Sequence, residues 1–302
     1  MYMNIILTAL ELGLISGITT LALFLSYEQL NVCDLSTDGC FTLGAVVGVS
    51  VALMGHPHIA FIFAIIAGML SGLVVALLQT YMGIDSLLSG IIVNTGLYSI
   101  NIAIMSGSSI LNMNRIESIF IRARETFAPF PFKEFYRVIV ALVVVAILVF
   151  LLSYFLKTRL GLAIRATGNN KDMVKSSSIN PYMTTIVGLV IANGFTALSG
   201  SLLAELQKGV NIDIGTGQVT IALASLLIGK TFIRKGSITI RAIGAVLGSI
   251  IFRIIYTIAL RFRMPAYMLK LVSSIIVIIA LTAPYLKSKM AYLNRRFLNV
   301  KS

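Results

Sequence analysis

Long apolar stretches alternate with short polar breaks along almost the whole chain. A membrane-spanning helix needs about 20 predominantly apolar residues, and by that measure the pattern predicts about nine hydrophobic segments. They lie at 4–25, 40–54, 59–80, 86–106, 136–157, 182–204, 217–229, 238–260 and 264–285. We therefore expect an all-α, polytopic membrane protein in which residues 1–302 form a single transmembrane domain.

Two of these segments, 40–54 and 217–229, are too short to cross a bilayer. Each follows a polar stretch that contains glycine, NVCDLSTDGCFT before the first and NIDIGTGQVT before the second. A short apolar segment beside a glycine-interrupted polar one is typical of a broken or re-entrant helix. We expect two such elements.

The two polar stretches also resemble each other, because placing Gly39 on Gly217 brings Thr42 onto Thr220. Five predicted spans separate the first helix from its counterpart at 182–204. This is an odd number, so the two halves would have inverted topology. The sequence thus predicts two inverted-repeat halves, which cover about 1–135 and 136–302.

The composition excludes a water-soluble globular protein, since 58% of residues are hydrophobic, 12% are charged and the mean hydropathy is +0.96. The formal net charge of +13 does not indicate nucleic-acid binding. The basic residues lie in the breaks between apolar segments, where the preference of Lys and Arg for cytoplasmic loops explains them.

The same preference predicts the orientation of the chain. The basic breaks at 158–180 and 230–235 and the basic tail at 287–296 should be cytoplasmic, which puts 107–135 outside. The N-terminus should then also lie outside. No basic region or cleavage site accompanies the first apolar segment, so we expect it to be a retained helix and not a signal peptide.

The longest polar break of the second half, 158–180, reads TRLGLAIRATGNNKDMVKSSSIN. Basic residues such as Arg159 and Lys175 alternate there with apolar ones such as Leu162 and Ile164. A short helix with one apolar side fits that pattern. Two interpretations remain open, a loop held in the cytoplasm by its charges and a helix that docks on a partner protein.

Four charged residues fall inside or at the end of predicted spans, where a charge costs about 2.5–3.5 kcal/mol at mid-bilayer. We expect Arg253 and Lys270 to extend toward an interface. Glu205, with Gln207 beside it, should face water or a pore. For Glu11, a buried ion pair and a cavity are equally open.

Asp34, Asp38 and Asp213 lie at the two broken stretches. Capping a half-helix is one sufficient role for such an Asp, and lining a solute path is the other. Asn94 and Asn193 lie inside spans, so they should point toward other helices, either as hydrogen-bonding partners or as pore lining.

No catalytic or metal site is expected. Cys33 and Cys40 lack metal or redox spacing, and the two histidines of GHPH belong to a predicted turn. No Ser lies in a nucleophile motif. Lys230 and its neighbours imitate the end of a phosphate-binding loop, but Ala224 stands where that motif needs glycine. We therefore expect neither an ATP site nor another cofactor in this chain.

The segment TRLGLAIRATGNNKDM closely resembles the cytoplasmic coupling segment of ABC importer permeases of the branched-chain amino acid and ribose type. Three longer motifs resemble a subgroup of tryptophan and tyrosine uptake permeases. They are DLSTDGCFTLGA at 34–45, LLSGIIVNTGLYSINIAIM at 87–105 and ALSGSLLAELQKGVNIDIGTG at 197–217. The resemblance implies the permease subunit of an ATP-driven uptake system for a small organic solute, with an aromatic amino acid suggested by analogy.

The resemblance also implies roles for particular residues. The coupling segment would include Gly161, Arg165, Ala166, Gly168 and Asn169. The translocation pathway would include Asp34, Asp38, Gly39, Thr42, Asn94, Asn193, Gln207, Asp213 and Gly217. Lys230 departs from the family pattern, which has an acid after the preceding glycine, and no role is assigned to it.

In systems of this type two permease chains form the pathway, two cytoplasmic ATPases bind ATP and Mg²⁺, and an extracellular binding lipoprotein delivers the solute. The resemblance thus implies a homodimer in the bilayer of a bacterial cell membrane. A stand-alone secondary transporter or channel is the alternative, because broken helices in inverted halves suit it equally. An intramembrane enzyme that uses the acids is a third reading without a supporting motif.

Overall fold

The computed structural model describes residues 2–113, 119–121, 135–233, 236–261, 271, 274–278 and 282. Within them the chain is predominantly helical, which confirms the all-α class. Eight of the predicted segments coincide with helices. The ninth, 264–285, lies almost wholly outside the described residues, so the total of nine stays a prediction.

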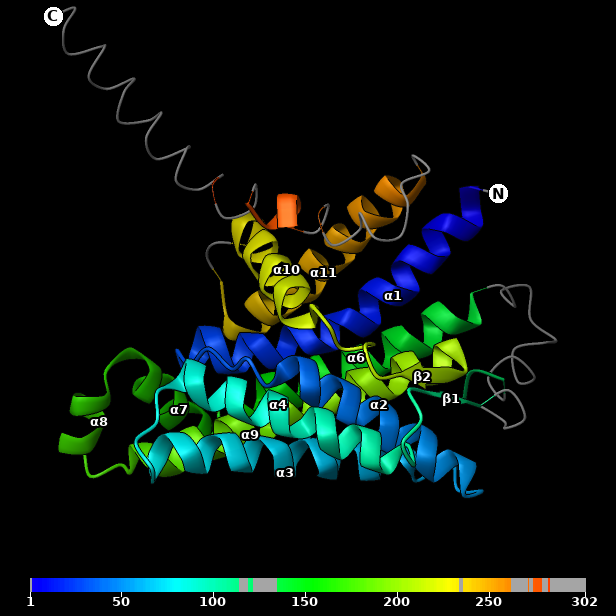
Figure 1. The fold of residues 1–302 in the computed structure, drawn as a ribbon. Coiled ribbons are helices and arrows are strands. Elements are labelled where there is room, and N and C mark those ends of the chain that lie inside the picture. The colour runs from blue at the N-terminus through cyan, green and yellow to red at the C-terminus, as the bar shows by residue number, and fades with distance from the viewer. Residues whose placement is uncertain are drawn as a thin grey trace, which may run out of the picture.

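Figure 1 shows the helices gathered into one bundle. In chain order they are α1 (Tyr2–Leu23), the π-helix η1 (Phe24–Gln29), α2 (Thr37–Leu53), α3 (Ala60–Thr80), α4 (Ser86–Ile104), α6 (Tyr136–Phe155), α7 (Arg159–Asn169), α8 (Lys171–Ser176), α9 (Pro181–Gln207), α10 (Gln218–Phe232) and α11 (Ile238–Arg261). Two short strands, β1 (Ile110–Asn112) and β2 (Gly209–Asn211), pair antiparallel.

Six of the described helical segments are long and apolar enough to cross a membrane. They are Ile6–Gln29, Ala60–Thr80, Ser86–Ile104, Tyr136–Phe155, Pro181–Gln207 and Ile238–Ala259. The two segments predicted to be too short are indeed short, since α2 has 17 residues and α10 has 15. The chain is therefore a polytopic membrane protein.

The centre of the bundle is α9, which packs against α2 on one side and α3 on another. A Cβ atom added at Gly200 would lie 2.0 Å from the carbonyl oxygen of Phe41, and one added at Gly44 would lie 2.1 Å from that of Ala197. These backbones touch because only glycine leaves room, as is common between membrane helices. The packing of α9 on α2 thus depends on glycine.

A second group consists of α1, α10 and α11, which lie above the first group in Figure 1. Here a Cβ atom added at Gly13 would lie 2.9 Å from Cα of Ile250. Ser249 donates a hydrogen bond to the carbonyl oxygen of Gly13. A Cβ atom added at Gly248 would lie 2.0 Å from the carbonyl oxygen of Ser225. Small residues therefore set this interface as well.

The structure corrects two expectations about charged residues in spans. Arg253 does not extend to an interface but is buried, and it donates from Nε and Nη2 to Oγ of Ser16 on α1, at 3.3 and 3.1 Å. Glu205 is buried in protein instead of facing water, and its Oε2 accepts a hydrogen bond from the amide of Ile119. In both cases a hydrogen bond to a residue distant in the sequence accounts for the buried position of the charged side chain.

For Glu11, the structure favours the ion pair, since its Oε2 lies 3.8 Å from Nη1 of Arg137 on α6. Lys270 lies outside the described residues. The first helix is also longer than expected, because η1 carries it to Gln29. Glu28, on the last turn of η1, forms an ion pair with Arg241 of α11.

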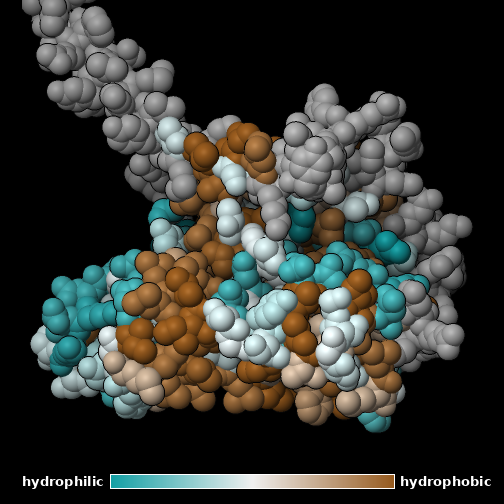
Figure 2. Space-filling view, viewed as in Figure 1, coloured by the Kyte–Doolittle hydropathy of each residue, from teal (hydrophilic) through white to brown (hydrophobic). Residues whose placement is uncertain are grey.

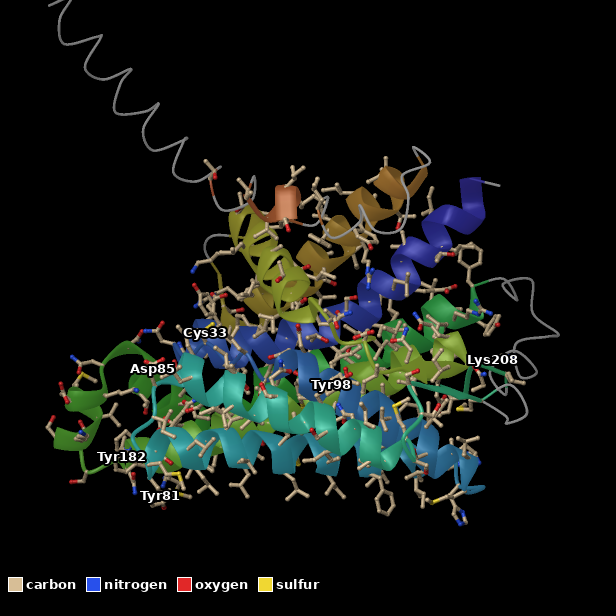
Figure 3. The ribbon with its side chains drawn as sticks, in the orientation of Figure 1. Cys33, Tyr81, Asp85, Tyr98, Tyr182 and Lys208 are labelled. Carbon is tan, nitrogen blue, oxygen red and sulfur yellow. The ribbon has the colours of Figure 1, made fainter. Side chains whose placement is uncertain are left out.

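Helices α7 and α8 lie at one end of the bundle, whereas the N-terminus and the β1–β2 pair lie at the other (Figure 1). This arrangement agrees with a cytoplasmic 158–180 and an outer N-terminus. At the α7 end, Tyr81 and Tyr182 stack with ring centroids 6.5 Å apart and join α3 to α9 (Figure 3). The inverted repeat of the two halves stays a prediction.

Candidate functional site

The segment 158–180 folds as two short helices with ordered caps. Thr158 begins α7, and its Oγ1 accepts a hydrogen bond from the amide of Gly161. Asn170 ends α7 and begins α8, since its Oδ1 accepts from the amides of Asp172 and Met173 at 3.0 Å each. Such caps satisfy amides that a helix start leaves without partners. The segment is a defined element and not an irregular loop.

One side of α7 is seated on the bundle. A Cβ atom added at Gly168 would lie 2.1 Å from the carbonyl oxygen of Gln29, the last residue of η1. Ile164 is fully buried, and Oγ1 of Thr167 lies 2.8 Å from Oγ1 of Thr184 on α9. The seat of α7 therefore consists of the end of η1 and the first turns of α9.

The other side of the segment is exposed. Its exposed residues include the apolar Leu160, Leu162 and Met173 and the basic Arg159, Lys171 and Lys175. In Figure 2 this end forms a largely teal lobe beside the brown, apolar face of the bundle. An exposed surface of mixed apolar and basic residues outside the membrane suits contact with another protein better than contact with lipid tails.

The five residues expected in the coupling segment take different positions. Gly161 and Gly168 make close backbone approaches, Gly161 to Phe155 and Leu156 and Gly168 to η1. Arg165 and Ala166 are half-buried, and Asn169 is exposed. The two glycines thus position the helix, and the exposed residues are free to meet a partner.

A second site lies where the two broken stretches meet. It is a pocket of about 140 Å³ between the start of α2, the middle of α4 and the loop that enters α10. Its lining consists of Asp38, Gly39, Thr42, Asn94, Tyr98, Asn101, Ile212, Asp213 and Thr216. The lining is mainly polar in a chain that is mainly apolar.

Asp38 joins the two broken stretches. It stands in the first turn of α2, and its carboxylate accepts from the amides of Gly217 and Val219 at 2.8 Å each. It therefore caps α10 from about 180 residues away in sequence, where a carboxylate also meets the positive end of the helix dipole. The capping role is thus observed for Asp38, which also lines the pocket, whereas its place in a solute path stays a prediction.

Asp34 lies deeper than Asp38 and has a structural role. Its Oδ1 accepts from the amide of Ser36 at 2.8 Å, and its Oδ2 accepts from Nδ2 of Asn193 at 2.7 Å. Both side chains are buried. The pair connects the turn before α2 to the middle of α9, so Asn193 acts as a hydrogen-bonding partner between helices.

The structure brings together five of the nine residues predicted for the pathway. The pocket contains Asp38, Gly39, Thr42, Asn94 and Asp213. Gly217 adjoins it through its bond to Asp38, with φ at +84°. Asp34 and Asn193 lie behind it, and Gln207 is exposed at the end of α9, away from the lining.

Sequence reasoning missed four lining residues, Tyr98, Asn101, Ile212 and Thr216. A signal existed for two of them, because Tyr98 and Asn101 follow Asn94 at spacings of four and seven residues, which puts all three on one helix face. Asn101 Nδ2 donates to the carbonyl oxygen of Gly39 at 3.3 Å. Ile212 and Thr216 had no comparable periodic signal.

Near its middle, α4 exposes polar residues among apolar ones, since Ile91, Ile92 and Ile100 are exposed there as well. Thr95, Tyr98 and Ser99 are exposed near the middle of the helix, and Figure 3 shows Tyr98 at the centre of the molecule. Lipid-facing positions of a membrane helix are apolar. The three polar positions are therefore less suited to lipid than the isoleucines beside them.

Among the described residues, no group of three His, Cys, Asp or Glu side chains lies close enough to hold a metal ion. Both cysteines are free. His56 and His58 lie in the predicted turn between α2 and α3, where Gly55 has φ at +92°.

Residues 5–281 match the family described as the branched-chain amino acid transport system permease component. The chain is 34% identical over 282 residues to a tyrosine transport system permease protein of Clostridioides difficile, covering 91% of this chain and 90% of that one. It is 31% identical over 287 residues to the uncharacterized protein RP368 of Rickettsia prowazekii, covering 93% and 98%.

A more distant relative is the nucleoside ABC transporter permease protein NupC of Lactococcus lactis, which is 23% identical over 248 residues and covers 77% of this chain and 74% of that one. No solved structure matches the chain. The family match extends over both sites described above, from the pocket residues to the α7–α8 segment.

Proposed function

The chain belongs to the family of branched-chain amino acid transport system permease components, and on that premise we propose that its solute is an aromatic amino acid such as tyrosine. It is the multi-pass permease subunit of an ABC uptake system in a bacterial cell membrane. Such a permease works with an ABC ATPase and a substrate-binding protein. The aromatic solute is supported by the name of the Clostridioides difficile relative.

The observation that carries coupling to an ATPase is the seat of α7. Gly168 lies against the carbonyl oxygen of Gln29, and Thr167 is hydrogen-bonded to Thr184, so a push on α7 toward the bundle would act directly on η1 and α9. Its exposed side offers Leu160 and Leu162 to a partner. ATP-driven closure of the ATPase would push α7, and the packed helices would pass the displacement on.

The pocket at Asp38 is the part of the pathway that one chain supplies. Its polar lining is kept in register by the bonds from Asp38 to the start of α10. A movement of α10 against α2 would therefore open or close it. Because a separate protein captures the solute, the permease needs only weak affinity, which a small polar pocket provides.

A second copy of the chain would complete the pathway. The exposed polar side chains of α4, Thr95, Tyr98 and Ser99, support this, since lipid-facing positions are usually apolar. Two copies that face each other across this surface would enclose a polar path between them. ATP and Mg²⁺ belong to the partner ATPase, and this chain contributes no catalytic residue of its own.

A reconstitution experiment tests the proposal. The tagged chain is purified with the proteins that accompany it and placed in liposomes, and labelled L-tyrosine uptake is measured with and without ATP and the binding protein. We expect uptake that needs both and persists when proton and sodium gradients are collapsed. Uptake that follows a gradient and ignores ATP would support a secondary transporter and overturn the coupling role of α7.

A double variant links that experiment to α7. Charge reversal at Arg165 combined with Gly168→Ala should abolish ATP-dependent uptake, while the amount of chain in the membrane stays at the wild-type level. Normal uptake by this variant would contradict the coupling assignment.

A further inference from the structure

A second cavity lies at the α7 end of the molecule, between the last turn of η1 and α10. Its volume is about 210 Å³, and its lining consists of Tyr27, Glu28, Asn31, Leu226, Leu227 and Lys230. None of these residues lines the pocket at Asp38. Sites for drug-sized ligands occupy about 300–1,000 Å³, so this cavity suits a smaller solute, about the size of an amino acid.

The charges around the cavity favour an anionic group. Glu28 is balanced by Arg241, whose Nε lies 3.1 Å from Glu28 Oε1. Lys230 is exposed at the end of α10 and forms no hydrogen bond or ion pair with another described residue. The lining with its Arg241 neighbour therefore carries one unbalanced positive charge, to which a carboxylate would be attracted.

The remaining lining fits the rest of an amino acid. Leu226 and Leu227 form an apolar wall, and Tyr27, which also lines the cavity, is 40% exposed. The amide of Asn31 has no hydrogen-bond partner among the described residues. Glu28 Oε2 is a second carboxylate oxygen, available to an ammonium group, because the bonds from Arg241 go to Oε1. The cavity thus offers a cation, an anion and an apolar wall.

The cavity adjoins the seat of the coupling helix. Asn31 comes two residues after Gln29, whose carbonyl oxygen touches Gly168 of α7. Glu28 belongs to η1, and π-helical turns are frequently found at functional sites. A ligand that bridges Glu28 and Lys230 would tie η1 to α10. It would thereby hold the surface on which α7 rests.

We propose that this cavity is a cytoplasm-facing site for the transported amino acid, and that its occupation slows the ATP-driven cycle. The inference rests on the function proposed above, both for the solute and for the coupling role of α7. A ligand shifts a conformational equilibrium only if it prefers one state. Tying η1 to α10 stabilises the state described here, so accumulated product opposes the next movement of α7.

The test uses liposomes that hold the complete transporter with its ATPase facing outward and with the binding protein, saturated with L-tyrosine, inside. ATP hydrolysis is measured while L-tyrosine is added outside, on the cytoplasmic side. We expect external L-tyrosine to lower hydrolysis several-fold. Tyramine, which lacks the carboxylate, should not inhibit at the same concentrations.

Lys230→Met should raise the half-inhibitory concentration of external L-tyrosine about tenfold, which is the usual effect of losing one charge-assisted hydrogen bond. Hydrolysis without external L-tyrosine should stay at the wild-type rate. Lys230→Arg should retain inhibition. Lys208→Gln, at an exposed lysine at the opposite end of α9, is the matched control and should behave like wild type.

Three results would overturn the inference. If loaded binding protein stimulates hydrolysis but external L-tyrosine does not reduce it, the cavity is not a regulatory site and the proposed transport function stands. Equal inhibition of wild type and Lys230→Met also refutes this cavity as the site. If loaded binding protein does not stimulate hydrolysis at all, the proposed solute and this inference are both wrong.

Discussion

Gly168→Ala tests the seat of α7 with a single methyl group. The added Cβ atom would lie 2.1 Å from the carbonyl oxygen of Gln29 and 2.9 Å from the carbonyl carbon of Leu30. Contacts between carbon and a carbonyl oxygen settle at about 3.3–3.6 Å, so α7 must move away from η1 by roughly 1 Å. Both clashing groups are backbone, and a side-chain rotation cannot relieve the clash.

The effect on folding should be small, because two terms oppose each other. Overpacking costs about 1–3 kcal/mol, while alanine is better than glycine inside a helix by about 1 kcal/mol. The net loss in the free energy of unfolding is then between about 0 and 2 kcal/mol. We therefore expect the variant to reach the membrane in normal amounts.

The effect on transport should be much larger. A displacement of about 1 Å in a positioned group lowers enzyme rates by up to about 10²-fold, and in the proposed mechanism α7 passes its movement to η1 through this contact. We expect ATP-dependent L-tyrosine uptake into liposomes to fall at least about tenfold. The assay compares initial uptake rates at equal amounts of reconstituted chain.

Gly96→Ala is the matched control, since Gly96 lies inside α4 and an added Cβ atom meets nothing within 4 Å. It should transport at the wild-type rate. If Gly168→Ala also transports within about twofold of wild type at normal abundance, the contact between α7 and η1 does not carry the coupling movement, and the reasoning fails.

Three further substitutions test the packing and the caps. Asp38→Asn should lower both the melting temperature and uptake, because the side-chain amide cannot accept both hydrogen bonds from the start of α10. The expected loss in the free energy of unfolding is about 1–3 kcal/mol. Asp213→Asn, in the same pocket but exposed, should leave the melting temperature unchanged. Gly200→Ala should reduce the amount of folded chain recovered in detergent, because the new Cβ atom would lie 2.0 Å from the carbonyl oxygen of Phe41. Gly194→Ala should be tolerated, because its Cβ atom would lie 3.1 Å from Cγ of Met69, a flexible side chain. Thr158→Ala should lose about 1 kcal/mol of α7 capping and lower uptake a few-fold, with Thr158→Ser restoring it; equal uptake by the two variants would contradict the role of the cap.

The hydrophobic pattern predicted most of the fold, because each span carries its own signal within about 20 residues. It also identified α2 and α10 as short helices, since the glycine-bearing polar stretches before them are local features as well. The alternation of basic and apolar residues at 158–180 predicted a short helix there in the same way, and α7 confirms it. Features encoded within a single segment could therefore be predicted from the sequence.

Contacts between segments far apart in the chain could not be predicted from the sequence. The similarity of the two polar stretches suggested that they are equivalent, but nothing in it indicated that Asp38 of one caps the helix of the other. Arg253 was expected at an interface because its partner, Ser16, lies 237 residues away in sequence. The π-helical end of the first span was missed because Tyr27 and Glu28 interrupt the apolar pattern.

Helix α9 is in contact with both α7 and the Asp34 turn that lies behind the pocket. Thr184 in its first turns contacts α7, and Asn193, nine residues later, holds Asp34. At 1.5 Å per residue these contacts are about 14 Å apart along one helix. Backbone contact with α2 at Gly200 prevents α9 from sliding freely. If α7 moves α9, as the proposed function requires, the displacement would reach the Asp34 turn and, four residues further, the carboxylate that caps α10.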